Sequence, residues 1–97
     1  MLQNFKTYHL AVELHEKCKA SVIKGAARSQ LDRASLSVAL NIAEGSAKTS
    51  IADRKRFYEM ALASCRETQA ILHINKQHDL FKLADAVGGC LYRLVHR

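Results

Sequence analysis

The chain has 97 residues, of which 48% are hydrophobic and 25% charged, and it carries a net charge of +6. A chain of this length forms one domain and buries only about two-thirds of the surface that its unfolded form exposes, so its core is small. No apolar run reaches the ~20 residues of a membrane span, and the N-terminal sequence does not look like a secretion signal. We therefore expect a cytoplasmic protein with no membrane partner. The positive charge favours an anionic partner such as nucleic acid.

Apolar side chains in the first half of the chain predict two amphipathic helices. They recur at three- and four-residue steps from about residue 4 to residue 24, where Gly25 supplies a stop. A second stripe predicts a helix over 30–44, with Ser29 as its N-cap and Gly45 closing it in the left-handed conformation. The two stripes consist of Phe5, Tyr8, Val12, His15, Cys18 and Val22, and of Leu31, Ala34, Val38 and Ile42.

The second half of the chain predicts two more helices. Ser50 and Asp53 form a Ser-x-x-Asp capping pattern, so a helix is expected over 51–77. Its apolar stripe consists of Phe57 with Tyr58, Ala61, Cys65, Thr68 and Leu72. Asp79 is a candidate N-cap for a last helix over 80–95.

Four such helices with short connections predict an all-α fold, an antiparallel up-down-up-down four-helix bundle in a single domain over residues 1–97. The pair Gly88-Gly89 is unfavourable inside the last helix, because each glycine costs about 1 kcal/mol relative to alanine. A tight helix crossing, a kink or early fraying would each account for the pair.

The cysteines and histidines follow no metal or disulfide pattern. Cys18, Cys65 and Cys90 lie in three separate apolar segments, which predicts buried free thiols. None of the five histidines belongs to a His-Glu-x-x-His or Glu-x-x-His motif. His15 lies on an apolar stripe, where a hydrogen-bonded core histidine is expected. We therefore predict no metal and no cofactor.

The stretch from Asn41 to Phe57, NIAEGSAKTSIADRKRF, combines an acid, a glycine and a basic triplet. It has no Gly-Lys-Ser/Thr ending and so lacks a phosphate-cradling loop. Glu44 would need a partner within reach and a pocket to act as a general acid or base, and the sequence identifies neither. We therefore expect a structural role for Glu44 and no enzyme activity.

The basic residues of this stretch are candidates for function. Arg54, Lys55 and Arg56 occupy the first turns of the third expected helix, close in sequence to Lys48. Three consecutive helical positions spread around the helix, so at least two face solvent. The alternative is a face that is merely solvated, but cations at a helix N-terminus oppose the helix dipole, which phosphate contacts would offset. Because aromatic residues for stacking are scarce, contacts to the nucleic-acid backbone are favoured over base readout.

The run from Arg33 to Leu72 carries a further set of positions. They are Arg33 with Ala34, the sequence Asn41-Ile42-Ala43-Glu44-Gly45, Phe57, and Ala61 with Ser64 and Glu67. With these positions the run resembles the four-helix bundle family associated with intervening sequences in bacterial 23S ribosomal RNA genes, which includes the accessory subunit of diversity-generating retroelements. The family signature consists of Arg33, Asn41, Glu44, Gly45, Phe57 and Glu67.

The resemblance implies an antiparallel bundle that assembles as a homopentamer and has no known catalytic activity. For the retroelement branch it implies binding to a reverse transcriptase and to nucleic acid through a basic surface. It also implies that Asn41 and Glu44 hold the second helix against its neighbours or against the next subunit.

Our first hypothesis is a non-catalytic nucleic-acid-binding bundle that contacts structured RNA, with DNA as a second candidate. Its candidate binding residues are Lys48, Arg54, Lys55, Arg56 and Arg66. The alternative is a protein-interaction module that delivers a partner enzyme such as a reverse transcriptase. A third class, a cofactor-binding bundle enzyme, would require the purified protein to carry a metal or a chromophore.

Small residues predict where the bundle associates. Ser35, Ser37 and Ala39 cannot all share the core stripe of the second helix, and Gly88-Gly89 would suit close approach of another helix. We therefore expect these surfaces to form contacts between subunits.

Overall fold

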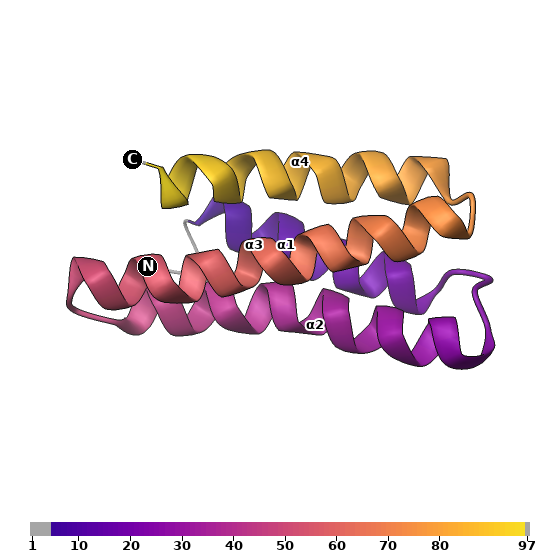
Figure 1. Cartoon of the computed structure of the whole chain (residues 1–97), viewed down its shortest axis with the longest axis horizontal. Helices are drawn as coiled ribbons and strands as arrows, with labels where there is room; N and C mark the ends of the chain where they lie inside the picture. The colour runs from indigo at the N-terminus through magenta and orange to yellow at the C-terminus, as the bar shows by residue number, and fades with distance from the viewer. Residues whose placement is uncertain (1–4, 97) are drawn as a thin grey trace.

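The computed structural model describes residues 5–96, which form four helices and no strand. The helices are α1 (Lys6–Lys19), α2 (Gly25–Ala47), α3 (Ile51–Ile74) and α4 (His78–Val95). This confirms the predicted all-α class and its four helices for this part of the chain. Figure 1 shows each helix running opposite to the one before it, with the start of α1 and the end of α4 at the same end of the bundle. Among the described helices, none is long and apolar enough to cross a membrane.

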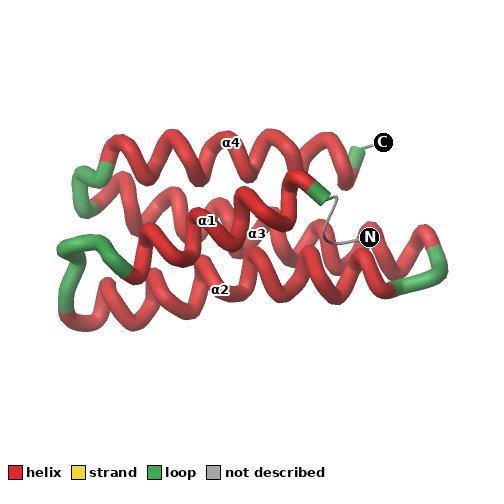
Figure 2. The backbone as a smooth tube through the Cα atoms, turned by 180° about the vertical axis from the view of Figure 1, so that it is seen from behind, coloured by secondary structure: helices red, strands yellow, loops and turns green. Residues whose placement is uncertain are grey.

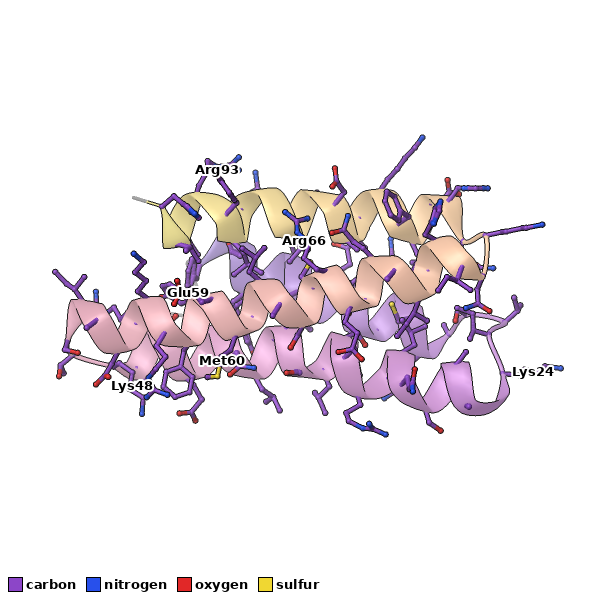
Figure 3. All side chains as sticks on the ribbon, in the orientation of Figure 1. Lys24, Lys48, Glu59, Met60, Arg66 and Arg93 are labelled. Carbon is purple, nitrogen blue, oxygen red and sulfur yellow. The ribbon has the colours of Figure 1, made fainter. Side chains whose placement is uncertain are left out.

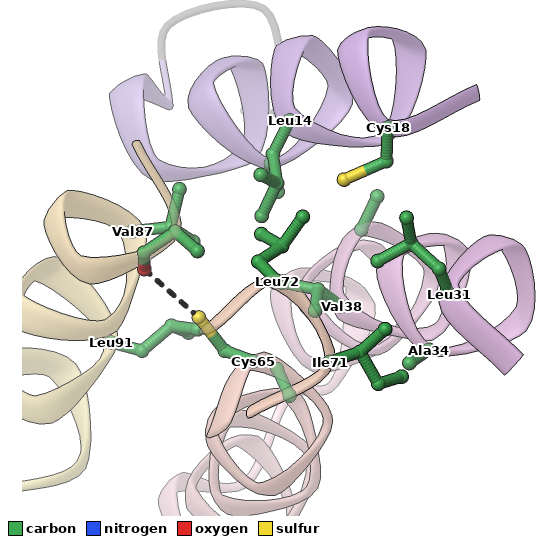
Figure 4. Close-up of a cluster of buried hydrophobic side chains, with 14 of the residues drawn as sticks. Leu14, Cys18, Leu31, Ala34, Val38, Cys65, Ile71, Leu72, Val87 and Leu91 are labelled. Carbon is green, nitrogen blue, oxygen red and sulfur yellow. Dashed lines mark hydrogen bonds between the residues drawn. The ribbon is translucent and has the colours of Figure 1, made fainter. Parts of the chain in front are cut away.

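Side chains from all four helices fill one core. Figure 4 shows leucines and cysteines converging from α1, α2, α3 and α4. The largest of the fully buried side chains are Leu14, Leu31, Ile42, Leu72 and Leu91. The predicted stripes of α2 and α3 are confirmed, because Leu31, Val38, Cys65 and Leu72 are all fully buried.

The three cysteines are free thiols in the structure. Cys18 and Cys65 are buried as predicted, whereas Cys90 is half-buried. Burial raises the pKa of Cys65 to about 11, so its thiol stays protonated. That thiol donates a hydrogen bond of 3.2 Å to the carbonyl oxygen of Ala84 and so joins α3 to α4 (Figure 4).

α1 is shorter than the predicted helix over 4–24. It ends at Lys19, and the chain then passes through residues 20–24 into α2. Arg28 of α2 donates hydrogen bonds to the carbonyl oxygens of Lys19, Ser21 and Ile23. This guanidinium therefore provides hydrogen-bond donors to the last carbonyl group of α1 and to two carbonyl groups of the connection that follows.

The core-facing side of α1 also differs from the predicted stripe. Ala11 and Leu14 are fully buried, whereas Tyr8 and Val12 are half-buried and Val22 is exposed. The buried line of α1 runs through Ala11, Leu14 and Cys18, and Cys18 is the one residue of the predicted stripe that is fully buried. The expected role of His15 is confirmed, since its Nδ1 lies 2.8 Å from Ser35 Oγ of α2 and its side chain is half-buried.

α2 is longer than the predicted helix over 30–44, and both of its glycines act differently from the prediction. Gly25, with a φ of +67°, begins α2 rather than ending α1. Gly45 does not close α2 but lies buried inside its last turns. A Cβ added at Gly45 would lie 2.7 Å from Cε1 of Tyr58, so the absence of a side chain allows α3 to pack closely against α2.

The predicted cap of α3 is confirmed. The backbone N–H of Asp53 donates to Ser50 Oγ at 3.0 Å, which satisfies one of the free donors at the start of the helix. α3 ends at Ile74 rather than at residue 77. α4 begins at His78, so Asp79 lies in its first turn and is not its N-cap.

The small residues predicted to form contacts between subunits pack within the chain. Ser35 and Ala39 are buried, and Ser37 Oγ lies 2.8 Å from Ser64 Oγ of α3. Gly88 is buried against Arg66 of α3, within an unbroken α4. The predicted association surface is therefore wrong for Ser35, Ala39 and Gly88, because packing within the chain buries them, whereas Ser37 and Gly89 are half-buried.

Candidate nucleic-acid interface

Four of the five predicted binding residues lie at the end of the bundle where α2 passes into α3. We call Lys48, Arg54, Lys55 and Arg56 the basic end. Only residues 48–50 separate the two helices, and the Ser50 cap fixes where α3 begins. Arg54 Nε donates a hydrogen bond of 2.8 Å to the carbonyl oxygen of Lys48, so the triplet is tied to the connection before it.

Two cations of the basic end lie against the ring of Phe57. Lys48 Nζ is 5.0 Å and Arg56 Cζ is 4.6 Å from the ring centroid. Figure 3 shows Lys48 near the end of the bundle where α2 passes into α3. Cation–π contacts of this kind hold both side chains in place, and they cover the ring that a nucleobase would need for stacking.

The same two cations also have acidic neighbours. Lys48 Nζ lies 3.6 Å from Glu44 Oε2, and Arg56 Nη2 lies 3.9 Å from Asp53 Oδ1. All four side chains are at least a third exposed, and solvent-exposed pairs contribute about 0–1 kcal/mol. A phosphate can therefore compete with these carboxylates for the cations.

Arg54 and Lys55 form no ion pair with any acidic side chain in the part of the chain that the structure describes. Both are exposed, and both line a cleft beside the start of α1 and the end of α4. These two residues are therefore the positive charges of the basic end that are least compensated within the chain.

Arg66, the fifth predicted binding residue, lies apart from the basic end. Figure 3 shows it along α3 on the side that faces α4. Its Nη1 donates to Gln69 Oε1 at 2.7 Å, and Gln69 Nε2 donates to Asp85 Oδ1 of α4 at 3.1 Å. The guanidinium also covers Gly88, where an added Cβ would lie 2.7 Å from Nη1. Arg66 thus joins α3 to α4 in the structure, and the sequence pattern could not distinguish it from a surface cation.

Asn41 and Gly45 of the family signature hold α2 against α3. Asn41 Nδ2 donates to the carbonyl oxygen of Ser37 at 2.9 Å and to its Oγ at 3.0 Å. Ser37 Oγ in turn contacts Ser64 Oγ across the helix pair, and Gly45 receives the Tyr58 ring.

Arg33 and Glu67, also of the signature, are exposed and have no hydrogen bond or ion pair among residues 5–96. They lie on the outer side of the α2–α3 pair, next to a group of exposed apolar side chains. We call Leu36, Leu40 and Met60 the apolar face, with exposed fractions of 41%, 55% and 38%. The sequence analysis did not predict this face. The spacing offers a signal for it, because Leu36 and Leu40 are four residues apart and therefore share one side of α2, two positions away from the core residues Ala34 and Val38.

Fold and site together define a class of protein: a small all-α bundle with a concentrated set of cations where two of its helices meet. The family model described as 23S rRNA-intervening sequence protein matches residues 4–87. The chain belongs to this family, and the matched range contains the basic end, the apolar face and every signature residue. No curated protein and no solved structure matches the chain.

Proposed function

We propose that this protein is a non-catalytic, cytoplasmic nucleic-acid-binding bundle that contacts structured RNA through its basic end. The observation that carries the proposal is that Lys48, Arg54, Lys55 and Arg56 lie where α2 passes into α3, and that two of them form no ion pair among residues 5–96. The family's name, which refers to sequences within ribosomal RNA genes, supports RNA over DNA as the partner.

The chemistry of the basic end favours contact with phosphates rather than with bases. Lys48 and Arg56 lie against the Phe57 ring, so an unpaired base would have to compete with them to stack on it. Lysine and arginine contacts to phosphate release counterions, and such contacts position a nucleic acid without reading its sequence. The proposed mode is therefore recognition of a folded RNA by its shape and backbone.

Fluorescence anisotropy with a labelled RNA hairpin, a DNA duplex of matched length and an unstructured single strand tests this proposal. Lys55→Ala is expected to weaken hairpin binding and to lower the slope of log affinity against log salt by about 1. Lys24→Ala is the matched control, because Lys24 is an exposed lysine at the opposite end of the bundle (Figure 3). Absence of binding to all three nucleic acids at low salt would overturn the proposal, as would equal losses for the two variants.

A second observation, the apolar face, supports association of the protein with itself. The two leucines and the methionine of this face expose apolar surface to water, and a bound partner would cover that surface. The unpaired Arg33 and Glu67 beside it offer opposite charges for contacts between copies. We propose a homo-oligomer built on this face, of five subunits as the resemblance implies, which would gather several basic ends for one RNA.

Sedimentation equilibrium tests the association. The wild-type protein is expected to sediment well above the monomer mass of 10.8 kDa at tens of micromolar, and Leu40→Asp is expected to shift it to that mass. Val22→Asp is the control, because Val22 is 75% exposed but lies in the connection between α1 and α2. A wild-type monomer would overturn self-association and leave the apolar face to a different protein, such as the reverse transcriptase implied for the retroelement branch.

A further inference from the structure

The basic end adjoins a cleft that its nucleic-acid role does not require. The cleft has a volume of about 570 Å³, within the range of small-molecule sites. Figures 1 and 2 show that α2 and α3 extend past the start of α1 and the end of α4, so among residues 5–96 the first turn of α3 has fewer helices beside it than the middle of α3 has. The helix lengths agree, with 24 residues in α3 against 14 in α1 and 18 in α4.

The walls of the cleft are apolar. They are formed by Phe5, Ile51, Tyr58, Leu94 and Val95. Phe5 and Tyr58 meet edge to face, with ring centroids 6.2 Å apart, and give the cleft an aromatic wall. Ile51 is 82% exposed at the first position of α3, so its side chain gains the most from being covered.

The remaining lining residues are the two unpaired cations, Arg54 and Lys55. Nε of Arg54 is bonded to the Lys48 carbonyl oxygen, which holds the guanidinium while its Nη groups have no bonding partner among residues 5–96. Among residues 5–96, the only other polar side chain of the lining is Tyr58, whose hydroxyl lies 3.3 Å from Ser46 Oγ.

We propose that this cleft binds an amphipathic anion, with its apolar body against the aromatic and aliphatic walls and its carboxylate or phosphate on Arg54 and Lys55. A charge-assisted bond to the guanidinium would fix the head, and the walls would desolvate the body. The site uses two residues of the basic end but does not depend on RNA binding.

Isothermal titration calorimetry and NMR with four probes below their micelle concentrations test the proposal. Decanoate and decyl phosphate carry both parts of the ligand, decanol lacks the charge, and acetate lacks the apolar body. The charged decyl compounds are expected to bind at least about tenfold more tightly than decanol, the factor that one charge-assisted hydrogen bond supplies. Shift changes should centre on Phe5, Tyr58 and Leu94, and the tighter of the two charged probes identifies the natural head group as carboxylate or phosphate.

The first and last residues of α3 provide matched variants that do not touch the core. Ile51→Ser is expected to abolish decanoate binding and to leave hairpin RNA affinity unchanged, whereas Ile74→Ser, 75% exposed at the other end of α3, should change neither. Glu59→Gln, one turn along α3 from Lys55, should tighten decanoate binding by removing a nearby negative charge.

Three outcomes would each overturn the proposal: decanol binds as tightly as decanoate, the NMR shift changes centre on the apolar face, or neither charged probe binds at 1 mM. Loss of RNA binding alone would not.

Discussion

α3 meets its two neighbours through buried glycines, and the two contacts differ in what lies opposite the glycine. On the α2 side, Gly45 faces the ring of Tyr58, with an added Cβ 2.7 Å from Cε1. On the α4 side, Gly88 faces the guanidinium of Arg66, with an added Cβ 2.7 Å from Nη1. The distances are equal, but a nearly buried aromatic ring has little room to move, whereas the far end of an arginine can swing away.

The difference shows which contact fixes the position of the candidate site. The α2–α3 contact also contains the Ser37–Ser64 hydrogen bond, which Asn41 supports from within α2, and it leads directly into the basic end. On the α3–α4 side, the hydrogen bonds between helices are Cys65 to Ala84 and Gln69 to Asp85, and the side chain of Arg66 lies over Gly88. We infer that the α2–α3 pair sets the geometry of the basic end and that α4 can adjust without disturbing it.

Gly45→Ala is expected to have the largest effect. The new methyl group would collide with Tyr58, and overpacking of this kind costs about 1–3 kcal/mol of unfolding free energy. Because Tyr58 lies one turn after the triplet, the start of α3 should also shift and weaken RNA binding. Urea denaturation and anisotropy measure the two effects. A variant as stable as the wild type would show that the α2–α3 contact is as adjustable as the α3–α4 contact.

Asn41→Ala is expected to have the next largest effect. It removes two donors to Ser37 and is expected to cost about 1 kcal/mol, the typical net contribution of a hydrogen bond. Ser64→Ala removes the other end of the same chain of bonds, so the loss in the double variant should be smaller than the sum of the single losses. Additive losses in a urea denaturation cycle would show that the three side chains do not act together.

Gly88→Ala and Gly89→Ala test the adjustable side of α3. Gly89→Ala is expected to raise the unfolding free energy by up to about 1 kcal/mol, because alanine favours the helix and the nearest atom would be 3.9 Å away. At Gly88 the same gain of about 1 kcal/mol is offset by displacement of Arg66 from Gln69, so little net change is expected. A loss at Gly88 as large as that at Gly45 would remove the distinction between the two contacts.

Much of the fold could be predicted from sequence because local signals agree with it. The core stripes of α2 and α3, the Ser50 cap and the hydrogen-bonded His15 follow from periodicity and capping chemistry. The ends of α1 and α2 could not be predicted, because Arg28 terminates α1 from nine residues further along the chain. A long-range side-chain contact of this kind leaves no local pattern.

The candidate site was predictable only in part, for a similar reason. The basic triplet and Lys48 are visible in the sequence, and the short connection before Ser50 guarantees that they lie together. Arg66 reads as one more basic residue until its contact with Gln69 is seen. In a sequence, a glycine that ends a helix looks the same as a glycine that allows a close contact. The sequence therefore predicts that Gly45 ends α2, whereas in the structure it makes room for the ring of Tyr58.

A third helix contact, between α1 and α2, is expected to depend on pH and to have the smallest effect on the free energy of unfolding. His15 Nδ1 contacts Ser35 Oγ, and burial, followed by the charge of Lys19, lowers the pKa of His15 below its ordinary value of 6.5, although Asp32 and Glu16 oppose that shift. The unfolded chain therefore takes up this proton more readily than the folded protein does. The stabilisation from neutral His15 is complete above about pH 6.5 and is lost as the pH falls through the lowered pKa of the folded state. Urea denaturation at intervals from pH 7.5 to pH 5 should show this loss of stability in the wild type and a smaller loss in His15→Gln. If the free energy of unfolding changes with pH in the same way in both proteins, the α1–α2 contact does not respond to pH in this range.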